Sequence, residues 1–135
     1  MNFVELTPDQ LDEVEEKMEA FDEAFLGQRP EGHIRIGIEE DGVLVAGLDA
    51  CMTAFRILYV STVFVEGAFR RKGYGTRLIR EMEERAKAMG ATLIRLDTFG
   101  WQGKEFYEAL GYEIVGCYEQ AAEGYAEYFF LKRLG

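Results

Sequence analysis

The chain has 135 residues, of which 48% are hydrophobic and 13% aromatic, a composition typical of a folded domain rather than a disordered segment. Its formal net charge of −10 argues against a nucleic-acid partner, because phosphate binding needs a basic surface. No apolar run reaches the length of a membrane span, and the first residues lack the pattern of a signal peptide. We therefore expect a single cytoplasmic domain over residues 1–135, with no membrane partner.

The first predicted elements are a short strand over residues 3–6 and a long helix. Thr7-Pro8-Asp9-Gln10 is typical of a helix start, because Thr caps the helix, Pro suits its first turn and Gln completes a capping box. Gly27 predicts the end of this helix. Hydrophobic residues recur between them at helical spacing and predict one buried stripe, formed by Leu11, Val14, Met18, Phe21 and Phe25.

The middle of the chain reads as strands. Residues 33–38 alternate between apolar and polar, Asp41-Gly42 is a hairpin turn signal, and residues 43–52 return as the partner strand. Residues 57–65 form a further β-rich run. Cys51 and Cys117 show no metal or redox spacing and are expected to be reduced, buried thiols.

The second half alternates helices and strands. An amphipathic helix follows Gly75, ends at Gly90, and is expected to bury Leu78, Ile79, Met82, Ala86 and Met89. The remaining elements are a strand, a short helix and two final strands, over residues 92–98, 101–110, 112–118 and 125–131. This order predicts a mixed α+β fold, a mostly antiparallel sheet flanked by helices, with one right-handed β-α-β crossover.

The most informative stretch is Arg70-Arg71-Lys72-Gly73-Tyr74-Gly75-Thr76, between a strand and a helix. Glycines at such a junction let the backbone approach a ligand, and the helix start offers free N–H groups to an anion, usually phosphate. Charge supports this interpretation, since thirteen of the 25 acids precede residue 42 whereas five of the 15 bases lie between Arg70 and Arg80. The alternative is an ordinary tight turn. A dinucleotide fingerprint would need a third glycine at Leu78, and a P-loop would need Gly-Lys-Ser/Thr.

Two blocks carry a family resemblance. Val63-Phe64-Val65 followed by Arg70-Arg71-Lys72-Gly73-Tyr74-Gly75 resembles motif A of the GNAT superfamily, the acyl-CoA-dependent N-acyltransferases. Phe106-Tyr107-Glu108-Ala109-Leu110-Gly111-Tyr112 resembles the second family block, an aromatic-Tyr pair followed by Leu-Gly-aromatic. The resemblance covers residues 33–133 and points to the small single-domain acetyltransferases of bacteria. The chain departs from the family at Gly100, where an asparagine is usual.

The resemblance implies an N-acetyltransferase that uses acetyl-CoA as co-substrate and no metal. The backbone from Arg71 to Thr76 would cradle the pyrophosphate of coenzyme A, with nearby bases as countercharge. The strand before the turn would splay from its neighbour and pair with the pantetheine arm, and the Val65 N–H would face the thioester oxygen. The expected cofactor-binding residues are Val63, Phe64, Val65, Arg70, Arg71, Lys72, Gly73, Tyr74, Gly75 and Thr76.

Tyr107 is the expected catalytic acid. A tyrosine with a pKa of about 10 stays protonated near neutral pH and can protonate a departing thiolate; the alternative is an aromatic that packs the short helix onto the sheet. Asp97 is the candidate base, acting through a water, and its alternative role is a cap or turn acceptor near Gly100. Glu66 is expected to be exposed, and His33 to start a strand rather than act as a base.

The acceptor is expected to be a primary amine of a small molecule or peptide. In the resembling family its pocket is formed by the first helical region and the loop before the last strand, where acids such as Glu119 and Glu123 would attract a cation. Plain surface solubility is the alternative for these acids. The competing functions are a non-catalytic acyl-CoA-binding or regulatory module on the same fold, and a protein-interaction domain. Whether the chain forms a homodimer through its last strand stays open.

Overall fold

The computed structural model describes residues 1–135, which divide into two compact units, Met1–Pro30 and Glu31–Gly135. The first unit holds one helix, α1 (Pro8–Leu26). Thr7 and Gln10 form the expected capping box, and Gly27 ends the helix in the left-handed conformation with φ 81°. The predicted strand over residues 3–6 is wrong: this unit contains no other strand that could pair with it.

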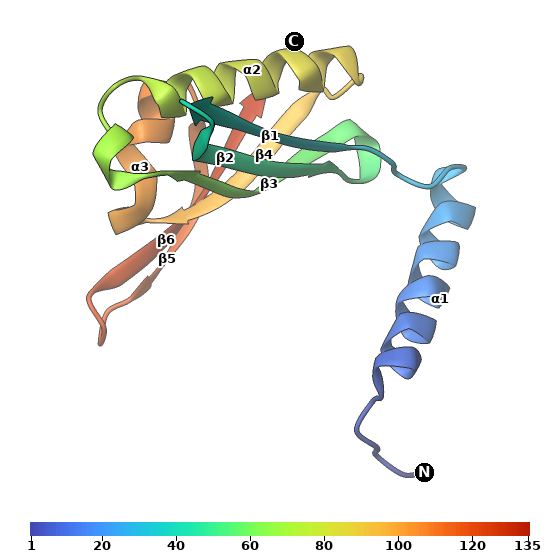
Figure 1. Ribbon diagram of the computed structural model, residues 1–135. Coiled ribbons are helices and arrows are strands. Elements are labelled where there is room, and N and C mark those ends of the chain that lie inside the picture. The colour runs from blue at the N-terminus through green and yellow to red at the C-terminus, as the bar shows by residue number, and fades with distance from the viewer. The chain divides into compact units, whose positions relative to one another are not determined.

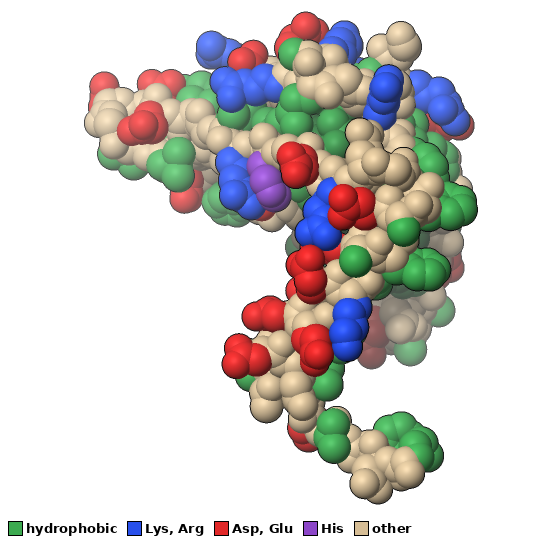
Figure 2. Space-filling view, turned by 90° about the vertical axis from the view of Figure 1, so that its right-hand side faces the viewer, with side chains coloured by type: hydrophobic (Ala, Val, Ile, Leu, Met, Phe, Trp, Pro, Cys, Tyr) green, Lys and Arg blue, Asp and Glu red, His purple; other side chains and the backbone are tan.

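The apolar stripe of α1 is exposed within its own unit, so the expected burial is not found there. Its members range from Leu11, 46% exposed, to Phe25, 82% exposed. Residues 1–30 contain no second helix or strand against which the stripe could pack. Acidic side chains crowd this helix (Figure 2). Helical spacing thus predicted where the stripe lies, but spacing alone carries no information about a partner.

The second unit is built on a six-stranded sheet in the order β1-β2-β3-β4-β6-β5 (Figure 1). Neighbouring strands are antiparallel except β3 and β4, which run parallel and are connected through helix α2. This mixed sheet with its helices confirms the predicted α+β fold. The strands are β1 (His33–Glu40), β2 (Val43–Met52), β3 (Ile57–Val65), β4 (Leu93–Phe99), β5 (Glu113–Gln120) and β6 (Tyr125–Arg133).

Two helices cover the sheet. α2 (Tyr74–Ala88) packs against β1, β2 and β3, and α3 (Gly100–Ala109) packs against β4 and β6. Ile79 and Met82 of α2 join Leu58 of β3 and Ile94 of β4 in one buried core. Four of the five predicted α2 core residues are buried; Met89 is exposed because it lies beyond the last turn of the helix.

The Asp41-Gly42 turn joins β1 to β2 with positive φ at both residues, as a two-residue hairpin loop requires. Both cysteines are free, but Cys117 is exposed rather than buried, because it lies on β5 at the edge of the sheet. None of the helices combines the length and apolarity needed to cross a membrane. No group of His, Cys, Asp and Glu side chains is arranged to hold a metal ion.

Candidate active site

The parallel strands β3 and β4 separate along the sheet. They pair only through residues 57–59 of β3 and 93–95 of β4, so residues 60–65 have no strand partner on that side. This splay is the geometry that the family resemblance implied. Because half of the backbone groups of a strand point to each side, the separation leaves donors and acceptors of β3 facing the gap.

The direction of those groups follows from the ladder with β2. The amide N–H of Glu66 donates to the Val45 carbonyl at 2.8 Å. Along an antiparallel strand the N–H groups alternate between its two sides, so the N–H groups of Val63 and Val65 point away from β2 and towards the gap. The N–H groups of these two residues are therefore available to a ligand that lies beside β3.

A cleft of about 720 Å³ occupies the splay. Its walls come from β3, the end of β4, the turn before α2, and α3. The predicted residues that line it are Val63, Phe64, Val65, Arg70, Arg71, Gly73, Gly75, Thr76, Asp97 and Tyr107. The structure thus brings the glycine turn, the strand before it and both candidate catalytic residues to one cleft, which we call the β3–β4 cleft.

The start of α2 opens onto this cleft. Gly73 occupies the N-cap position at φ 83° and no side chain caps the helix, so its first N–H groups have no side-chain acceptor. Gly75 is required by packing: a Cβ there would lie 3.1 Å from the Phe106 ring. The turn therefore combines a bare helix N-terminus with a tight fit against α3, and the former suits an anion.

The basic residues of the turn take different directions. The Arg70 guanidinium lies over the Phe64 ring, and its Nε donates to the Val65 carbonyl at 2.9 Å. Arg71 also lines the cleft and adopts a left-handed backbone conformation at φ 61°. Lys72 lies over the Phe69 ring instead and does not line the cleft. Two of the three bases, Arg70 and Arg71, therefore line the cleft onto which the start of α2 opens.

Tyr74 also points away from the cleft. Its hydroxyl donates to the Glu40 carboxylate, and its ring lies 5.8 Å from that of Phe69. The sequence predicted cofactor contacts for every residue from Arg70 to Thr76, but the side chains of a turn followed by a helix cannot all face one side. Lys72 and Tyr74 are the two that face elsewhere.

Tyr107 is buried, with 8% of its surface exposed, and its ring packs among those of Phe106, Tyr112 and Phe130. Burial raises the pKa of its hydroxyl to about 12. The hydroxyl forms no hydrogen bond with the protein. Every fully buried polar side-chain atom of the structure has a hydrogen-bond partner, so the Tyr107 oxygen is not one of the fully buried atoms. The oxygen of Tyr107 therefore keeps access to solvent, and it does so in the cleft that the residue lines.

The absence of a side chain at Gly103 leaves space for the Tyr107 ring. A Cβ at this position would lie 3.3 Å from the ring, closer than ordinary van der Waals contact. Thr98, buried at the end of β4, also lies near Gly103 and lines the cleft. The missing side chain at Gly103 thus gives the tyrosine room between α3 and the sheet.

Asp97 lies on β4 where the strands have separated, and its side chain is exposed. Its carboxylate accepts a hydrogen bond of 3.4 Å from the Tyr59 hydroxyl, whose pKa is raised by burial and by the charge of Asp97. The predicted alternative, a cap near Gly100, is not observed. The N–H of Phe99 before α3 is bonded to the side chain of Gln102 instead, at 2.8 Å.

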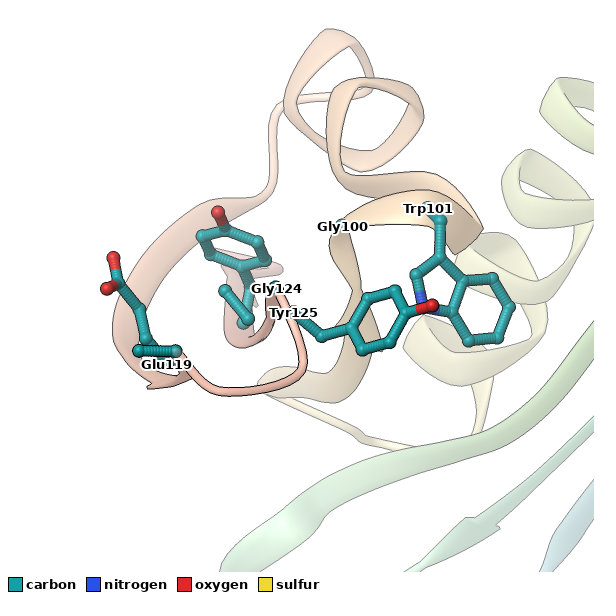
Figure 3. A pocket seen from close by; sticks show the side chains of 8 residues that line it. Gly100, Trp101, Glu119, Gly124 and Tyr125 are labelled. Atoms are coloured by element: carbon teal, nitrogen blue, oxygen red, sulfur yellow. The ribbon is translucent and has the colours of Figure 1, made fainter.

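A second hollow of about 510 Å³ lies beside the start of α3 (Figure 3). Trp101 and Tyr125 meet edge to face in its wall, with ring centroids 6.5 Å apart, and Tyr128 and Glu119 also line it. We call it the aromatic pocket. Trp101 lines both the aromatic pocket and the β3–β4 cleft, so the two hollows are neighbours.

Among the cleft residues outside the predicted set are Thr98, Trp101 and Gln102, of which only Trp101 was expected to line a pocket, that of the acceptor. All three lie where β4 ends and α3 begins, directly before the block that contains Tyr107. The available signal was positional: residues at the carboxyl end of a strand that separates from its neighbour tend to line the opening.

Known proteins resemble the chain throughout. The family model of the Acetyltransferase (GNAT) family matches residues 3–112. Blasticidin-S acetyltransferase of Streptomyces morookaense is 28% identical over 96 residues, 70% of each chain. The crystal structure of an acetyltransferase from Bacillus cereus ATCC 14579 matches with a TM-score of 0.89 and 27% identity, covering 98% of this chain and 97% of that one.

A more distant structure shares the fold. An aminoglycoside 6'-N-acetyltransferase complexed with coenzyme A has a TM-score of 0.67 and 23% identity, with 96% of this chain and 82% of that chain covered. Because the family model spans most of the sequence, and the splayed strands and bare helix N-terminus agree with it, the chain belongs to the GNAT acetyltransferase family.

Proposed function

We propose that the protein transfers the acetyl group of acetyl-CoA to a primary amine of a small molecule or peptide. The observation that carries this proposal is the arrangement of the β3–β4 cleft. It joins a strand with free backbone groups, an uncapped helix N-terminus and a tyrosine hydroxyl without a protein partner. A neighbour of the same fold was crystallised with coenzyme A, which supports the choice of co-substrate.

The cofactor would lie along β3 and over the start of α2. Val63 and Val65 would pair with the pantetheine arm through their free N–H groups, and Gly73, Gly75 and Thr76 would offer N–H groups to the pyrophosphate. Arg70 and Arg71 would add countercharge. The side chains of Lys72 and Tyr74 have no part in this arrangement, because they point away from the cleft.

The reaction would proceed by direct attack. The neutral amine forms a C–N bond to the thioester carbon, and the Val65 N–H stabilises the oxyanion that develops. Collapse breaks the C–S bond, the nitrogen gives up a proton, and the thiolate gains one. Asp97, exposed beside the Tyr59 hydroxyl, would take the proton of the amine through a water.

Tyr107 would act on the leaving sulfur. Its pKa of about 12 exceeds that of an ordinary thiol, about 8.5, so the hydroxyl keeps its proton until the sulfur carries charge. Its role is then to donate a strong hydrogen bond to the thiolate and share its proton as the C–S bond breaks. The burial that raises its pKa also keeps its ring fixed among neighbouring aromatics.

Two measurements test this function in sequence. Acetyl-CoA at a hundredfold excess over its dissociation constant should raise the free energy of unfolding by about 2.7 kcal/mol. A panel of primary amines, incubated with protein and acetyl-CoA, should then release free thiol for at least one acceptor. The absence of stabilisation would exclude the cofactor site. Stabilisation without thiol release from any amine would favour a non-catalytic acyl-CoA-binding module.

A further inference from the structure

The aromatic pocket has a composition that restricts its occupant. Three of its side chains are aromatic, Trp101, Tyr125 and Tyr128, and the single charged residue that lines it is Glu119. Trp101 is held in place, because its ring stacks on that of Phe99 with centroids 5.7 Å apart and planes nearly parallel. The pocket therefore presents rigid ring surfaces and edges rather than flexible polar groups.

The one negative charge of this pocket, the Glu119 carboxylate, lies at one end of it. The Glu119 carboxylate forms no ion pair or hydrogen bond within the chain, whereas that of Glu127 on the same hairpin accepts from the Tyr118 hydroxyl. In Figure 3 the Glu119 carboxylate and the Trp101 ring lie on opposite sides of the pocket. Lys104 already lies over the Tyr128 ring, 5.3 Å from its centroid, so that face is not free for a second cation. Glu119 is thus the one group here that favours a cation.

The position of Trp101 gives the pocket a direction. One end meets the β3–β4 cleft at Trp101, where the acetyl group would be delivered, and the other end is marked by Glu119. An acceptor that fills the pocket would present one end to the cleft and the opposite end to the carboxylate. The surfaces between these ends are aromatic.

We infer that the acceptor carries a flat, unsaturated ring between its reactive primary amine and a second, non-reacting cationic group. This inference rests on the proposed function and names its substrate class. The ring lies against Trp101 and Tyr125, the amine reaches the cleft, and the second cation pairs with Glu119. A polycation with charges spread around a saturated framework fits less well, because each additional charge would be desolvated against rings without a carboxylate to compensate it.

Three matched amines test the two parts of the inference. 1,4-Bis(aminomethyl)benzene and 1,4-bis(aminomethyl)cyclohexane share both amines and differ in the flatness of the ring; benzylamine has the ring but lacks the second cation. Binding is measured by calorimetry on the full chain saturated with coenzyme A. The aromatic diamine should bind about 2- to 12-fold more tightly than the cyclohexane diamine, the usual advantage of aromatic pairs. It should bind about two- to fivefold more tightly than benzylamine, as expected for a partly exposed ion pair.

Substitutions separate the contributions. Trp101→Leu should abolish the preference for the flat ring and keep the preference for the second cation, whereas Glu119→Gln should do the reverse. Glu113→Gln removes one exposed acid from the same strand, β5, but outside the pocket, and should leave both ratios unchanged. Trp101 and Glu119 are both exposed, so neither variant disturbs the core.

The result that overturns the inference is equal or tighter binding of the cyclohexane diamine, or ratios that persist in the Trp101 and Glu119 variants. Failure of the proposed function looks different, since acetyl-CoA would then neither stabilise the protein nor release thiol with any amine. Binding to the coenzyme A complex needs no turnover, so the substrate class is tested independently of catalysis.

Discussion

Tyr107 and Tyr112 are five residues apart in the sequence, and their ring centroids are 5.8 Å apart. Burial raises the pKa of both hydroxyls. They differ in what the hydroxyl meets. That of Tyr112 donates to the Glu83 carboxylate at 2.9 Å, whereas that of Tyr107 has no protein partner and reaches the β3–β4 cleft. A raised pKa alone therefore does not identify a functional tyrosine; a buried ring with a free hydroxyl in a cleft is the more informative combination.

The surroundings of Tyr112 form a structural network. Glu83 of α2 is 5% exposed and also accepts hydrogen bonds from Lys132 at 3.0 Å and Arg80 at 2.8 Å. Lys132 donates further to the Leu110 carbonyl at the end of α3. Although burial by itself raises the pKa of Glu83, the three hydrogen-bond donors lower it below its usual value. The network thus ties α2 to β6 and to the end of α3.

The comparison is tested most strongly by Tyr107→Phe. Loss of a positioned proton donor should lower kcat about 10²- to 10⁴-fold, while the affinity for coenzyme A and the free energy of unfolding stay near their original values. Because the pKa of Tyr107 is raised to about 12, the hydroxyl stays protonated across the assay range, and the deficit should be constant between about pH 7 and 9. Stopped assays of thiol release with a saturating amine measure this. A variant that keeps full kcat would remove Tyr107 from the mechanism.

The glycine turn and the block around Tyr107 could be predicted because each is encoded in a short stretch of sequence. The strands of the second unit followed from alternation and turn signals, and α1 from its capping box. Glu83 could not be predicted in this way. Helical spacing assigns an acid to the surface, and its partners Tyr112 and Lys132 come 29 and 49 residues later. The direction of Tyr74 likewise depends on Glu40, 34 residues earlier, which only the folded chain brings near.

The network around Tyr112 should respond in the opposite way to the site around Tyr107. Glu83→Gln removes the charge that Lys132 and Arg80 share, and should lower the free energy of unfolding by about 3 kcal/mol, at the lower end for a broken buried pair because Arg80 is half exposed. Urea denaturation measures this change, with kcat per folded molecule unaltered. The matched control is Glu81→Gln, an exposed partner of Arg85 on the same helix, which should cost less than about 1 kcal/mol.

The pH dependence of the free energy of unfolding tests the role of Glu83 a second time. The pKa of Glu83 is lower in the folded protein than in the unfolded chain, so the folded state holds fewer protons on this group. Its contribution to stability is therefore present above the unfolded pKa of about 4.3 and is lost as the pH falls through the folded value. Wild-type and Glu83→Gln proteins should differ most near neutral pH and converge in acid. A difference that stays constant with pH would mean that the carboxylate charge contributes nothing.

Tyr112→Phe has the smallest expected effect and gives the most direct comparison. It removes one tyrosine hydroxyl, as Tyr107→Phe does, from the neighbouring ring. Glu83 would lose one of three donors while Lys132 and Arg80 remain, so the free energy of unfolding should fall by about 1–2 kcal/mol. The Tyr112 hydroxyl faces Glu83 rather than the cleft, so kcat should not change. Denaturation and kinetics on the two Phe variants should therefore give crossed results: Tyr112→Phe loses stability and keeps turnover, and Tyr107→Phe does the reverse. Equal losses of turnover in both variants would mean that packing of the aromatic cluster, and not the free hydroxyl of Tyr107, supports the reaction.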